Sequence, residues 1–396
     1  MTLTAVPTVA AGRRWAMLGA STLAQVASAV MIHGPAFLIP SLHADGMSLA
    51  EAGLVAAAPT VGVMLTLVAW GAVTDRRGER FVLLTGLSIT VLAGVASALT
   101  SGTAALVLTL LLAGGAAATT NVAGGRVVVG WFPPDRRGLA MGIRQMAQPV
   151  GVGIAAISVA VVADAAGPHA ALWIPTVACA VAVVLVGAVV VDPPRPDAAD
   201  PVAAVNPYRQ DSFLARVHGV SVLLVVPQFL IWTFALVWLV QDRDWRPAAA
   251  GTVIAVAQVA GALGRIAAGH LSDRVHSRMR PLQWVAIAAA ATMALLGLAA
   301  ALDLAVAVVL VVVATVVTVA DNGLAFTAVV ERAGPFWSGR ALGVQNTAQF
   351  LAASAVPPLA GLAVTHIGYA AAFGLAALFP LVAAPLVPVR EERPLG

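Results

Sequence analysis

The stretch Gly71-Ala-Val-Thr-Asp75-Arg76-Arg77-Gly78-Glu79-Arg80 stands between two long apolar runs and carries three arginines. A segment that is so short and so charged predicts a tight turn between two membrane helices. Loops rich in arginine resist translocation across the bilayer, so we expect this turn on the cytoplasmic side.

A second, incomplete copy of the pattern occurs in the other half of the chain, as Gly269-His-Leu-Ser-Asp273-Arg274 followed by Arg278 and Arg280. The spacing G-x-x-x-D-R-x-G-x-R of the first copy resembles the signature loop between helices 2 and 3 of the major facilitator superfamily of secondary transporters. One copy would be suggestive, whereas two copies at corresponding places are specific. The sequence therefore predicts a membrane transporter.

The composition agrees with this prediction. Of the 396 residues, 60% are hydrophobic and only 10% are charged, which is too few to cover a soluble domain. Each span needs roughly 20 apolar residues, so the length accommodates about a dozen helices and no catalytic domain. We find no metal-ligand spacing, no nucleophile paired with a base and no phosphate-binding glycine loop, so we expect neither an enzyme nor a cofactor. The basic residues are all arginines and lie mainly in one set of loops, which predicts contact with the lipid bilayer and not with nucleic acid.

The expected fold is an all-α membrane protein with 12 transmembrane helices in two pseudo-symmetric six-helix bundles. The bundles are expected at 1–191 and 213–396, joined by a polar, proline-containing cytoplasmic linker at 192–212. The arginines of the loops fall on one side except Arg243 and Arg246, which predicts two cytoplasmic termini and a place in the cytoplasmic (plasma) membrane. The first apolar run is too long for a cleavable signal. The helices are expected at about 15–40, 49–73, 81–100, 104–132, 139–164, 170–191, 213–240, 247–271, 282–301, 304–330, 341–365 and 369–389.

The two halves also resemble each other in sequence. Gly142-Ile-Arg144-Gln145-Met-Ala147-Gln148 matches Gly343-Val-Gln345-Asn346-Thr-Ala348-Gln349, with residue numbers that differ by 201. The same offset carries Asn121 onto Asn322. Two related halves with a substrate site at the midplane between them are a known design of secondary transporters.

Polar side chains inside the predicted spans are costly in hydrocarbon, so we expect them to face a cavity or one another. The resemblance implies that helices 1, 4, 7 and 10 line this cavity. The alternative is that single amides only join neighbouring helices, through bonds worth about 0.6 kcal/mol on average. The candidate substrate-binding residues are Gln25, His33, Asn121, Arg144, Gln145, Gln148, Gln228, Trp232, Gln258, Asn322, Asn346 and Gln349.

Arginine inside the apolar segments is the main pointer to the kind of substrate. Arg144 lies about a turn and a half into its helix, and a guanidinium offers a planar, bidentate fork for a carboxylate or another anion. Its alternative role is to pair with Asp321 or with a backbone carbonyl. Arg126 and Arg265 lie nearer to predicted helix ends, so we expect them to extend to the interface or to pair with acidic loop residues.

Asp321 is the one carboxylate that the sequence places well inside a span. Burial disfavours the charged form of a carboxylate, so Asp321 is the first candidate for a proton-coupling residue. His33 is the second candidate. Asp321 could equally be the counter-charge of Arg144, and His33, which precedes Gly34-Pro35, could be a structural residue at a helix distortion.

The two signature turns imply gating residues. The resemblance implies that Asp75 contacts the amino end of helix 11 near Gly339-Arg340, and that Asp273 does the same at the start of helix 5. The second copy lacks the glycine of the first, so we expect the first contact to be the stronger. Glu79 stands where a basic residue is common. The candidate gating residues are Gly71, Asp75, Arg76, Gly78, Arg80, Asp273 and Arg274.

These observations favour a monomeric secondary active transporter that moves a small polar solute, an organic anion such as a monocarboxylate, by alternating access and with protons as the coupling ion. Helix 5 reads Ala147-Gln148-Pro149-Val-Gly151-Val-Gly153, without the Gly-Pro-x-x-Gly-Gly pattern of drug/proton antiporters. The alternative is a drug or metabolite efflux antiporter, for which Trp232 and Trp238 would suit amphipathic compounds.

Overall fold

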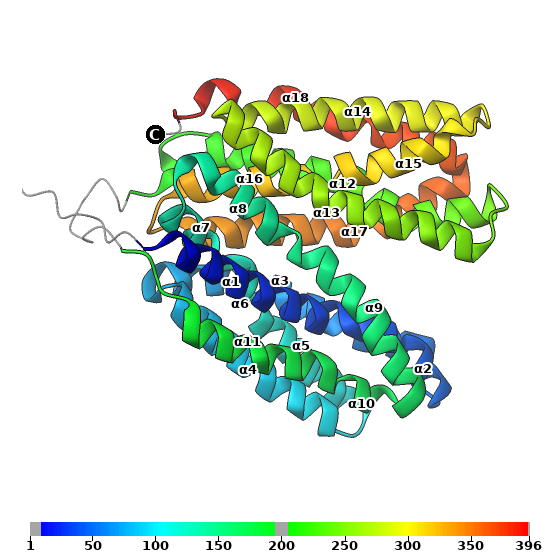
Figure 1. The fold of residues 1–396 in the computed structure, drawn as a ribbon. Coiled ribbons are helices and arrows are strands. Elements are labelled where there is room, and N and C mark those ends of the chain that lie inside the picture. The colour runs from blue at the N-terminus through cyan, green and yellow to red at the C-terminus, as the bar shows by residue number, and fades with distance from the viewer. Residues whose placement is uncertain (1–8, 195–204, 395–396) are drawn as a thin grey trace, which may run out of the picture. The chain divides into compact units, whose positions relative to one another are not determined.

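The computed structural model describes residues 9–194 and 205–394, and every regular element in these ranges is a helix (Figure 1). Ten residues of the predicted linker at 192–212, namely 195–204, lie outside the described residues. The long apolar stretches form helices because a helix satisfies all its backbone hydrogen bonds internally, as a lipid environment requires.

Eleven helical stretches of the described chain are long and apolar enough to cross a membrane. The last of them, Ser338–Glu391, has 54 residues and would be about 80 Å long as one helix, more than twice the hydrocarbon thickness of about 30 Å. Gly368 interrupts it with a φ of 78°, so this stretch contains two crossings. The other ten are Ala11–Ala44, Leu49–Arg77, Glu79–Leu99, Thr103–Trp131, Pro134–Ala166, Pro168–Val189, Phe213–Gln241, Ala249–Val275, Met279–Ala301 and Val306–Ala333.

The predicted all-α membrane fold with 12 transmembrane helices is thus confirmed. By their contacts, the described residues form two compact units. The division follows packing rather than the sequence repeat, and the boundaries predicted at 1–191 and 213–396 stay a prediction.

The first unit comprises the described residues of Met1–Pro133, Ala147–Val205 and Ala333–Asn346. In it α3 packs on α5, α4 packs on α5 and α11, and α1 packs on α9 and α11. Its apolar core includes Leu38, Val55 and Leu110. The helices are α1 (Ala11–His33), η1 (Gly34–Leu38), α2 (Ile39–Ala44), α3 (Leu49–Arg77), α4 (Glu79–Leu99), α5 (Thr103–Ala117), α6 (Thr119–Val122), α7 (Gly125–Trp131), α9 (Ala147–Ala166), α10 (Pro168–Ala171), α11 (Trp173–Val189) and the start of α17 (Ser338–Ala376).

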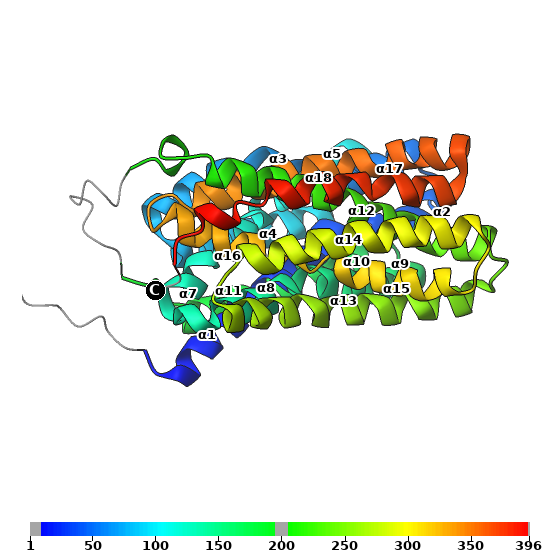
Figure 2. The same ribbon diagram turned by 90° about the horizontal axis from the view of Figure 1, so that it is seen from above.

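The second unit comprises Pro134–Met146, Asn206–Arg332 and the described residues of Thr347–Gly396. In it α8 lies along α13, and α14 packs on α15 and α18 (Figure 2). Trp238 and Phe373 meet in its apolar core. The helices are α8 (Pro134–Gln145), η2 (Pro207–Arg209), α12 (Phe213–Gln241), α13 (Pro247–Val275), α14 (Met279–Ala301), α15 (Val306–Val317), α16 (Asp321–Ala333), the rest of α17, α18 (Leu378–Leu386) and η3 (Val389–Glu391).

Three of the interrupted crossings carry candidate polar residues next to the break. One is interrupted at Ala118 between α5 and α6, and a second at 318–320 between α15 and α16. A third is interrupted at Met146 between α8 and α9. Backbone groups released at such breaks are tolerated at membrane depth only where protein or a cavity surrounds them. The breaks therefore mark positions at which we expect buried polar groups.

Candidate functional site

Three helices of the second unit come into backbone contact around two glycines. A Cβ atom on Gly142 of α8 would lie 2.6 Å from the carbonyl oxygen of Arg265 of α13. A Cβ atom on Gly323 of α16 would lie 3.3 Å from Cα of Gly142. Real Cβ atoms rarely make such short contacts, so the absence of side chains at these glycines allows the close approach. It brings the break before α16 next to the end of α8.

Charged groups collect at this crossing. Arg144, Arg265 and Asp321 are only 1%, 4% and 1% exposed, and all three belong to the second unit. Nη1 of Arg265 donates a 2.6 Å hydrogen bond to the carbonyl oxygen of Gln145, at the end of α8. Asp321 is two residues before Gly323, where a Cβ atom would lie 3.8 Å from the carbonyl oxygen of Arg265. The crossing thus buries Arg265 and Asp321, which we call the polar cluster, and Arg144 is buried one residue before the end of α8.

The structure corrects the sequence-based interpretation of Arg265. Its guanidinium does not extend to the interface, because Nη1 donates to the carbonyl oxygen of Gln145 at the end of α8 and the residue is buried. Arg126 is also buried, and its backbone N–H donates to Glu79 at 2.7 Å. Arg265 is therefore a residue of the polar cluster that the sequence did not assign to the site.

Asp321 lacks the partners that a buried carboxylate usually has. Neither of its carboxylate oxygens has a hydrogen-bond partner within the described chain. It is the first residue of α16, where the positive end of the helix offers partial compensation. A buried, unsatisfied acid of this kind calls for a functional explanation.

A chain of amides continues from the cluster. Nε2 of Gln349 donates to Oδ1 of Asn322 at 3.2 Å, and Nδ2 of Asn322 donates to Oε1 of Gln228 at 3.3 Å. One turn beyond Gln228, the buried Nε1 of Trp232 has no partner among the described residues. Gln258 of α13 is half-buried. The structure therefore brings together three of the predicted amides from α12, α16 and α17.

The first unit holds the other predicted polar residues. A ring nitrogen of His33 lies 3.1 Å from Nε2 of Gln148, so α1 and α9 meet there through a hydrogen bond. Nδ2 of Asn346 donates to the carbonyl oxygen of Asn121 at 3.2 Å. Gln25 is buried on α1, and its Oε1 has no partner in the described part of the chain. These contacts are equally those of a binding site and of amides that join helices.

The first signature turn makes the predicted contact. Oδ1 of Asp75 accepts the N–H of Gly339 at 2.7 Å, and Oδ2 accepts both the N–H of Arg340 at 3.0 Å and its Nε at 2.8 Å. A Cβ atom on Gly71 would lie 2.3 Å from the carbonyl oxygen of Gly339. We call this group the first latch: Gly71 and Asp75 of α3 with Gly339 and Arg340 at the start of α17.

The second signature turn makes the same contact in the second unit. The carboxylate of Asp273 accepts the N–H groups of Gly138 at 2.9 Å and of Leu139 at 2.8 Å. A Cβ atom on Gly269 would lie 2.1 Å from the carbonyl oxygen of Gly138. This is the second latch: Gly269 and Asp273 of α13 with Gly138 and Leu139 of α8.

The expectation that the first latch is the stronger stays a prediction, since the two latches make contacts of the same kind. Each aspartate accepts two backbone N–H groups and one guanidinium. The missing glycine is replaced by His276, which ends α13 with a φ of 51° and stands where Gly78, with a φ of 95°, ends α3. The turn therefore closes without glycine.

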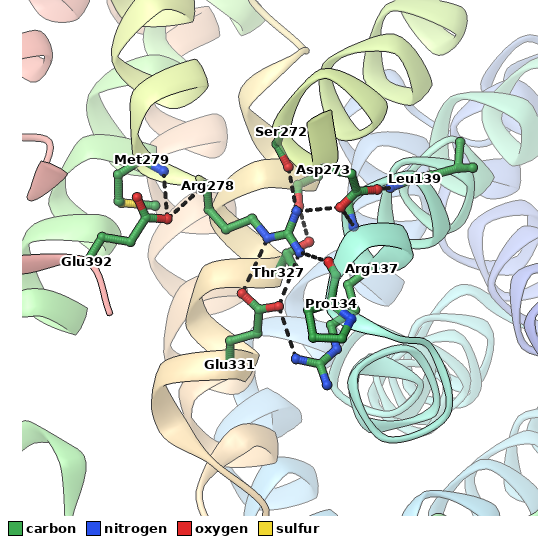
Figure 3. A network of polar contacts seen from close by, with 12 residues as sticks. Pro134, Arg137, Leu139, Ser272, Asp273, Arg278, Met279, Thr327, Glu331 and Glu392 are labelled. Atoms are coloured by element: carbon green, nitrogen blue, oxygen red, sulfur yellow. Dashed lines mark hydrogen bonds and ion pairs between the residues drawn. The ribbon is translucent and has the colours of Figure 1, made fainter. Parts of the chain in front are cut away.

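Arg278 supplies the guanidinium of the second latch and is the centre of a wider network (Figure 3). Nη1 donates to Asp273 at 2.5 Å, Nη2 donates to the carbonyl oxygen of Pro134 at 2.7 Å, and Nε and Nη2 each lie 3.3 Å from Glu331. Burial lowers the pKa of Arg278, but the neighbouring carboxylates of Glu331 and Asp273 outweigh this and leave the pKa raised. Arg278 thus joins α8, α13 and α16 as a permanent cation.

The tail after α18 is tied to the same network. The carboxylate of Glu392 accepts the N–H groups of Arg278 and Met279, at the start of α14, and the hydroxyl of Ser277 (Figure 3). Sequence reasoning missed both Glu392 and Glu331. Their partners are distant along the chain, and isolated acids near helix ends carry no distinguishing pattern.

The remaining residues of the first turn bind neighbouring segments of the first unit and do not take part in the latch. Arg80 donates to the carbonyl oxygen of Gly187 at 2.7 Å, and its backbone N–H donates to Asp192. The carboxylate of Glu79 accepts the backbone N–H groups of Arg126 and Val127 and so caps the amino end of α7. Arg76 and Arg274 are exposed. The glutamate at this unusual position therefore has a structural role.

Comparison with known proteins agrees with this architecture. The family model described as Major Facilitator Superfamily matches residues 17–357. The chain is 46% identical over 382 residues to an uncharacterized MFS-type transporter of Mycobacterium tuberculosis, covering 96% of this chain and 86% of that protein.

Solved structures are similar in fold. One is the Escherichia coli fucose:proton symporter, with a TM-score of 0.76 and 13% identity, covering 95% of this chain and 98% of that one. Another is a proton:xylose symporter bound to 6-bromo-6-deoxy-D-glucose, with a TM-score of 0.76 and 16% identity, covering 97% and 98%. At these identities the likeness concerns the fold alone.

Proposed function

Because this chain belongs to the major facilitator superfamily, and is thus a multi-pass transporter of small solutes, we propose that it carries a small organic anion together with a proton. Transport proceeds by alternating access of the halves 1–191 and 213–396. The protein acts as a monomer in the plasma membrane with both termini in the cytoplasm. The arginine-rich loops support this orientation.

The burial of arginines inside the membrane-spanning helices is the observation that carries the proposal. Arg265 and Asp321 are buried at the crossing of α8, α13 and α16, and Arg144 is buried one residue before the end of α8. A guanidinium inside the membrane can bind a carboxylate or another anion through charge-assisted hydrogen bonds, so buried arginines support an anionic ligand. A cationic drug would be repelled there, which disfavours the efflux reading.

Proton coupling is supported by the state of Asp321. Its carboxylate is buried without a hydrogen-bond partner in the described chain, and ionisable groups inside membrane spans commonly belong to proton pathways. The two solved structures of similar fold are named as proton symporters. His33, bonded to Gln148, is the second residue able to take up a proton.

The two latches supply the gating step. In each, a carboxylate holds the N–H groups of a segment against a glycine-lined helix. Neither contact uses Arg144, Arg265 or Asp321, so substitutions in the latches test gating separately from ligand binding. We assign gating to Gly71, Asp75, Gly269 and Asp273, while Arg80 stabilises α4.

The test measures ligand binding to the purified protein through the change in its thermal unfolding temperature, Tm. L-lactate and glycerol 3-phosphate serve as anions, and rhodamine 6G serves as a bulky amphipathic cation. A ligand raises Tm in proportion to the logarithm of its concentration over Kd. We expect an anion to raise Tm, and we expect Arg144→Gln to weaken its binding at least about tenfold, because a charge-assisted hydrogen bond is lost.

The matched control is Arg280→Gln, which removes an exposed arginine of α14 and should leave anion binding unchanged. Unchanged anion binding in Arg144→Gln would remove the anion proposal. Stabilisation by rhodamine 6G alone would instead support a drug or metabolite efflux antiporter, and Arg144 would then be a structural residue.

A further inference from the structure

A small cavity lies at the end of the second unit where α8, α12 and α14 begin and α16 ends. Its volume is about 210 Å³, which is room for about seven water molecules. Pockets for drug-sized ligands have roughly 300–1,000 Å³, so this one suits a single small group. All its lining residues belong to the second unit. We call it the basic cavity, and its charged lining residues are Arg137, Arg278, Glu331, Arg332, Glu392 and Arg393.

Two of the four arginines already have carboxylate partners outside the lining. Arg278 pairs with Asp273, and Arg332 pairs with Asp211. These pairs balance much of the charge around the basic cavity. The ability to bind an anion therefore depends on how the other two arginines are bonded.

Arg137 is held by a carboxylate that it shares. Figure 3 shows Glu331 between Arg137 and Arg278, at 3.4 Å from Nη1 of Arg137 and at 3.3 Å from both Nε and Nη2 of Arg278. Hydrogen bonds between a guanidinium and a carboxylate are usually about 2.7–2.9 Å long. One carboxylate thus serves two guanidinium groups over long distances, and a closer acceptor would bind Arg137 more strongly than Glu331 does.

Arg393 has a neutral partner in place of a carboxylate. Its Nη2 donates to Oε1 of Gln210 at 3.3 Å, and it forms no ion pair within the described part of the chain. The tail that carries Arg393 is fixed by the preceding residue, because Glu392 accepts the N–H of Met279 at 3.2 Å. An exposed guanidinium is therefore held at the basic cavity without a counter-charge of its own.

We propose that the basic cavity binds a phosphate group, either of a soluble phosphate ester or of an anionic lipid head group, through Arg137 and Arg393. A guanidinium fork matches the geometry of phosphate oxygens. A phosphate ester also offers more acceptor oxygens than a carboxylate, so one phosphate can serve two arginines. The bound group joins α8 to the tail after α18.

The basic cavity is distinct from the site of the proposed transport. Neither Arg144 nor the polar cluster of Arg265 and Asp321 lines it. Binding of phosphate here and transport of an organic anion can therefore be true or false independently of each other.

The first experiment measures Tm of the purified full chain in detergent with increasing inorganic phosphate, at an ionic strength matched with chloride. Phosphate should raise Tm, because it stabilises the state that it binds. Arg137→Gln and Arg393→Gln should each weaken phosphate binding at least about tenfold, because a charge-assisted hydrogen bond is lost. Arg393 is exposed, so Arg393→Gln serves if Arg137→Gln does not fold.

Two control variants accompany this experiment. Arg390→Gln removes an exposed arginine of the same tail that does not line the basic cavity, and it should bind phosphate as the wild type does. Arg144→Gln should also keep phosphate binding. Binding that is lost in Arg144→Gln and kept in Arg393→Gln would place the phosphate at the transport site and overturn the proposal.

The second experiment distinguishes the two sources of the phosphate group. Tm is measured in nanodiscs of phosphatidylcholine alone and of phosphatidylcholine with phosphatidylglycerol. An increase with phosphatidylglycerol that disappears in Arg393→Gln and persists in Arg390→Gln would assign the basic cavity to a lipid head group. An increase with inorganic phosphate in phosphatidylcholine nanodiscs, again absent in Arg393→Gln, would assign it to a soluble phosphate ester.

The proposal is overturned if neither inorganic phosphate nor phosphatidylglycerol raises Tm of the wild type. It is equally overturned if either probe stabilises the wild type, Arg137→Gln and Arg393→Gln to the same extent, because the binding would then not use the basic cavity.

Discussion

The two latches hold equivalent segments with equivalent carboxylates but obtain their guanidinium groups from different places. In the first latch Arg340 belongs to the segment that Asp75 holds. In the second latch Arg278 belongs to the turn that follows α13 itself, and it reaches the held segment through the carbonyl oxygen of Pro134. The same motif is therefore stabilised once by a direct ion pair and once by a network.

The two arginines also differ in burial, and this difference decides how much each one contributes to the free energy of unfolding. The side chain of Arg340 is 32% exposed and stacks on Trp337, whereas that of Arg278 is 1% exposed and touches Asp273 and Glu331. An exposed ion pair contributes about 0–1 kcal/mol. Removal of one partner from a buried pair is unfavourable by about 3–5 kcal/mol, since it leaves an uncompensated charge. The second latch should therefore be the more sensitive to loss of its arginine.

The largest effect is expected for Arg278→Gln. Asp273 and Glu331 would lose their shared cation in a buried place, so we expect a loss of about 3–5 kcal/mol in the free energy of unfolding. Thermal unfolding of the purified protein, together with uptake into proteoliposomes, measures it. Arg280→Gln, two residues away and exposed, is the matched control. An equal, small effect of both substitutions would show that the network is not needed.

An intermediate effect on the free energy of unfolding is expected when the latch glycines, Gly71 and Gly269, are replaced by alanine. Gly71→Ala and Gly269→Ala place a Cβ atom 2.3 Å and 2.1 Å from a carbonyl oxygen, so each held segment must move away. Overpacking of this kind is unfavourable by about 1–3 kcal/mol. We expect the two substitutions to open their latches alike, since the two distances are similar.

Cross-linking of cysteines introduced across each latch would follow the opening. Gly53→Ala in α3 and Gly251→Ala in α13 are the controls, because a Cβ atom at either position has no neighbour within 4 Å. Opening of one latch and not the other would mean that the similarity of the two glycine contacts does not extend to their strength.

The smallest effect is expected for Arg340→Gln. Asp75 keeps the two backbone N–H groups of Gly339 and Arg340, and the lost guanidinium is partly exposed. We expect a decrease of about 1 kcal/mol in the free energy of unfolding, measured beside Arg278→Gln under the same conditions. A decrease as large as that for Arg278→Gln would abolish the distinction between a direct pair and a network.

Much of the first latch was predictable from the sequence, because the residues that form the turn carry a recognisable spacing. Asp75 was expected to contact Gly339-Arg340, and it does. The residues of the second network were not predictable, since Pro134, Glu331 and Glu392 approach Arg278 from three distant segments. His276 was missed as well, because a histidine with a left-handed φ replaces the glycine that the motif leads one to expect.

The sequence by itself determined the helical membrane fold, its repeat and the position of the turns, because hydropathy, loop charge and local spacing act along the chain. Only the tertiary structure decided that Arg265 is buried beside Gln145 and Asp321 rather than directed to the interface. The physical reason is that lipid and protein interior are both apolar. A membrane helix therefore does not reveal its inward face by hydrophobic periodicity, and close packing at glycines such as Gly142 and Gly323 settles which polar groups meet.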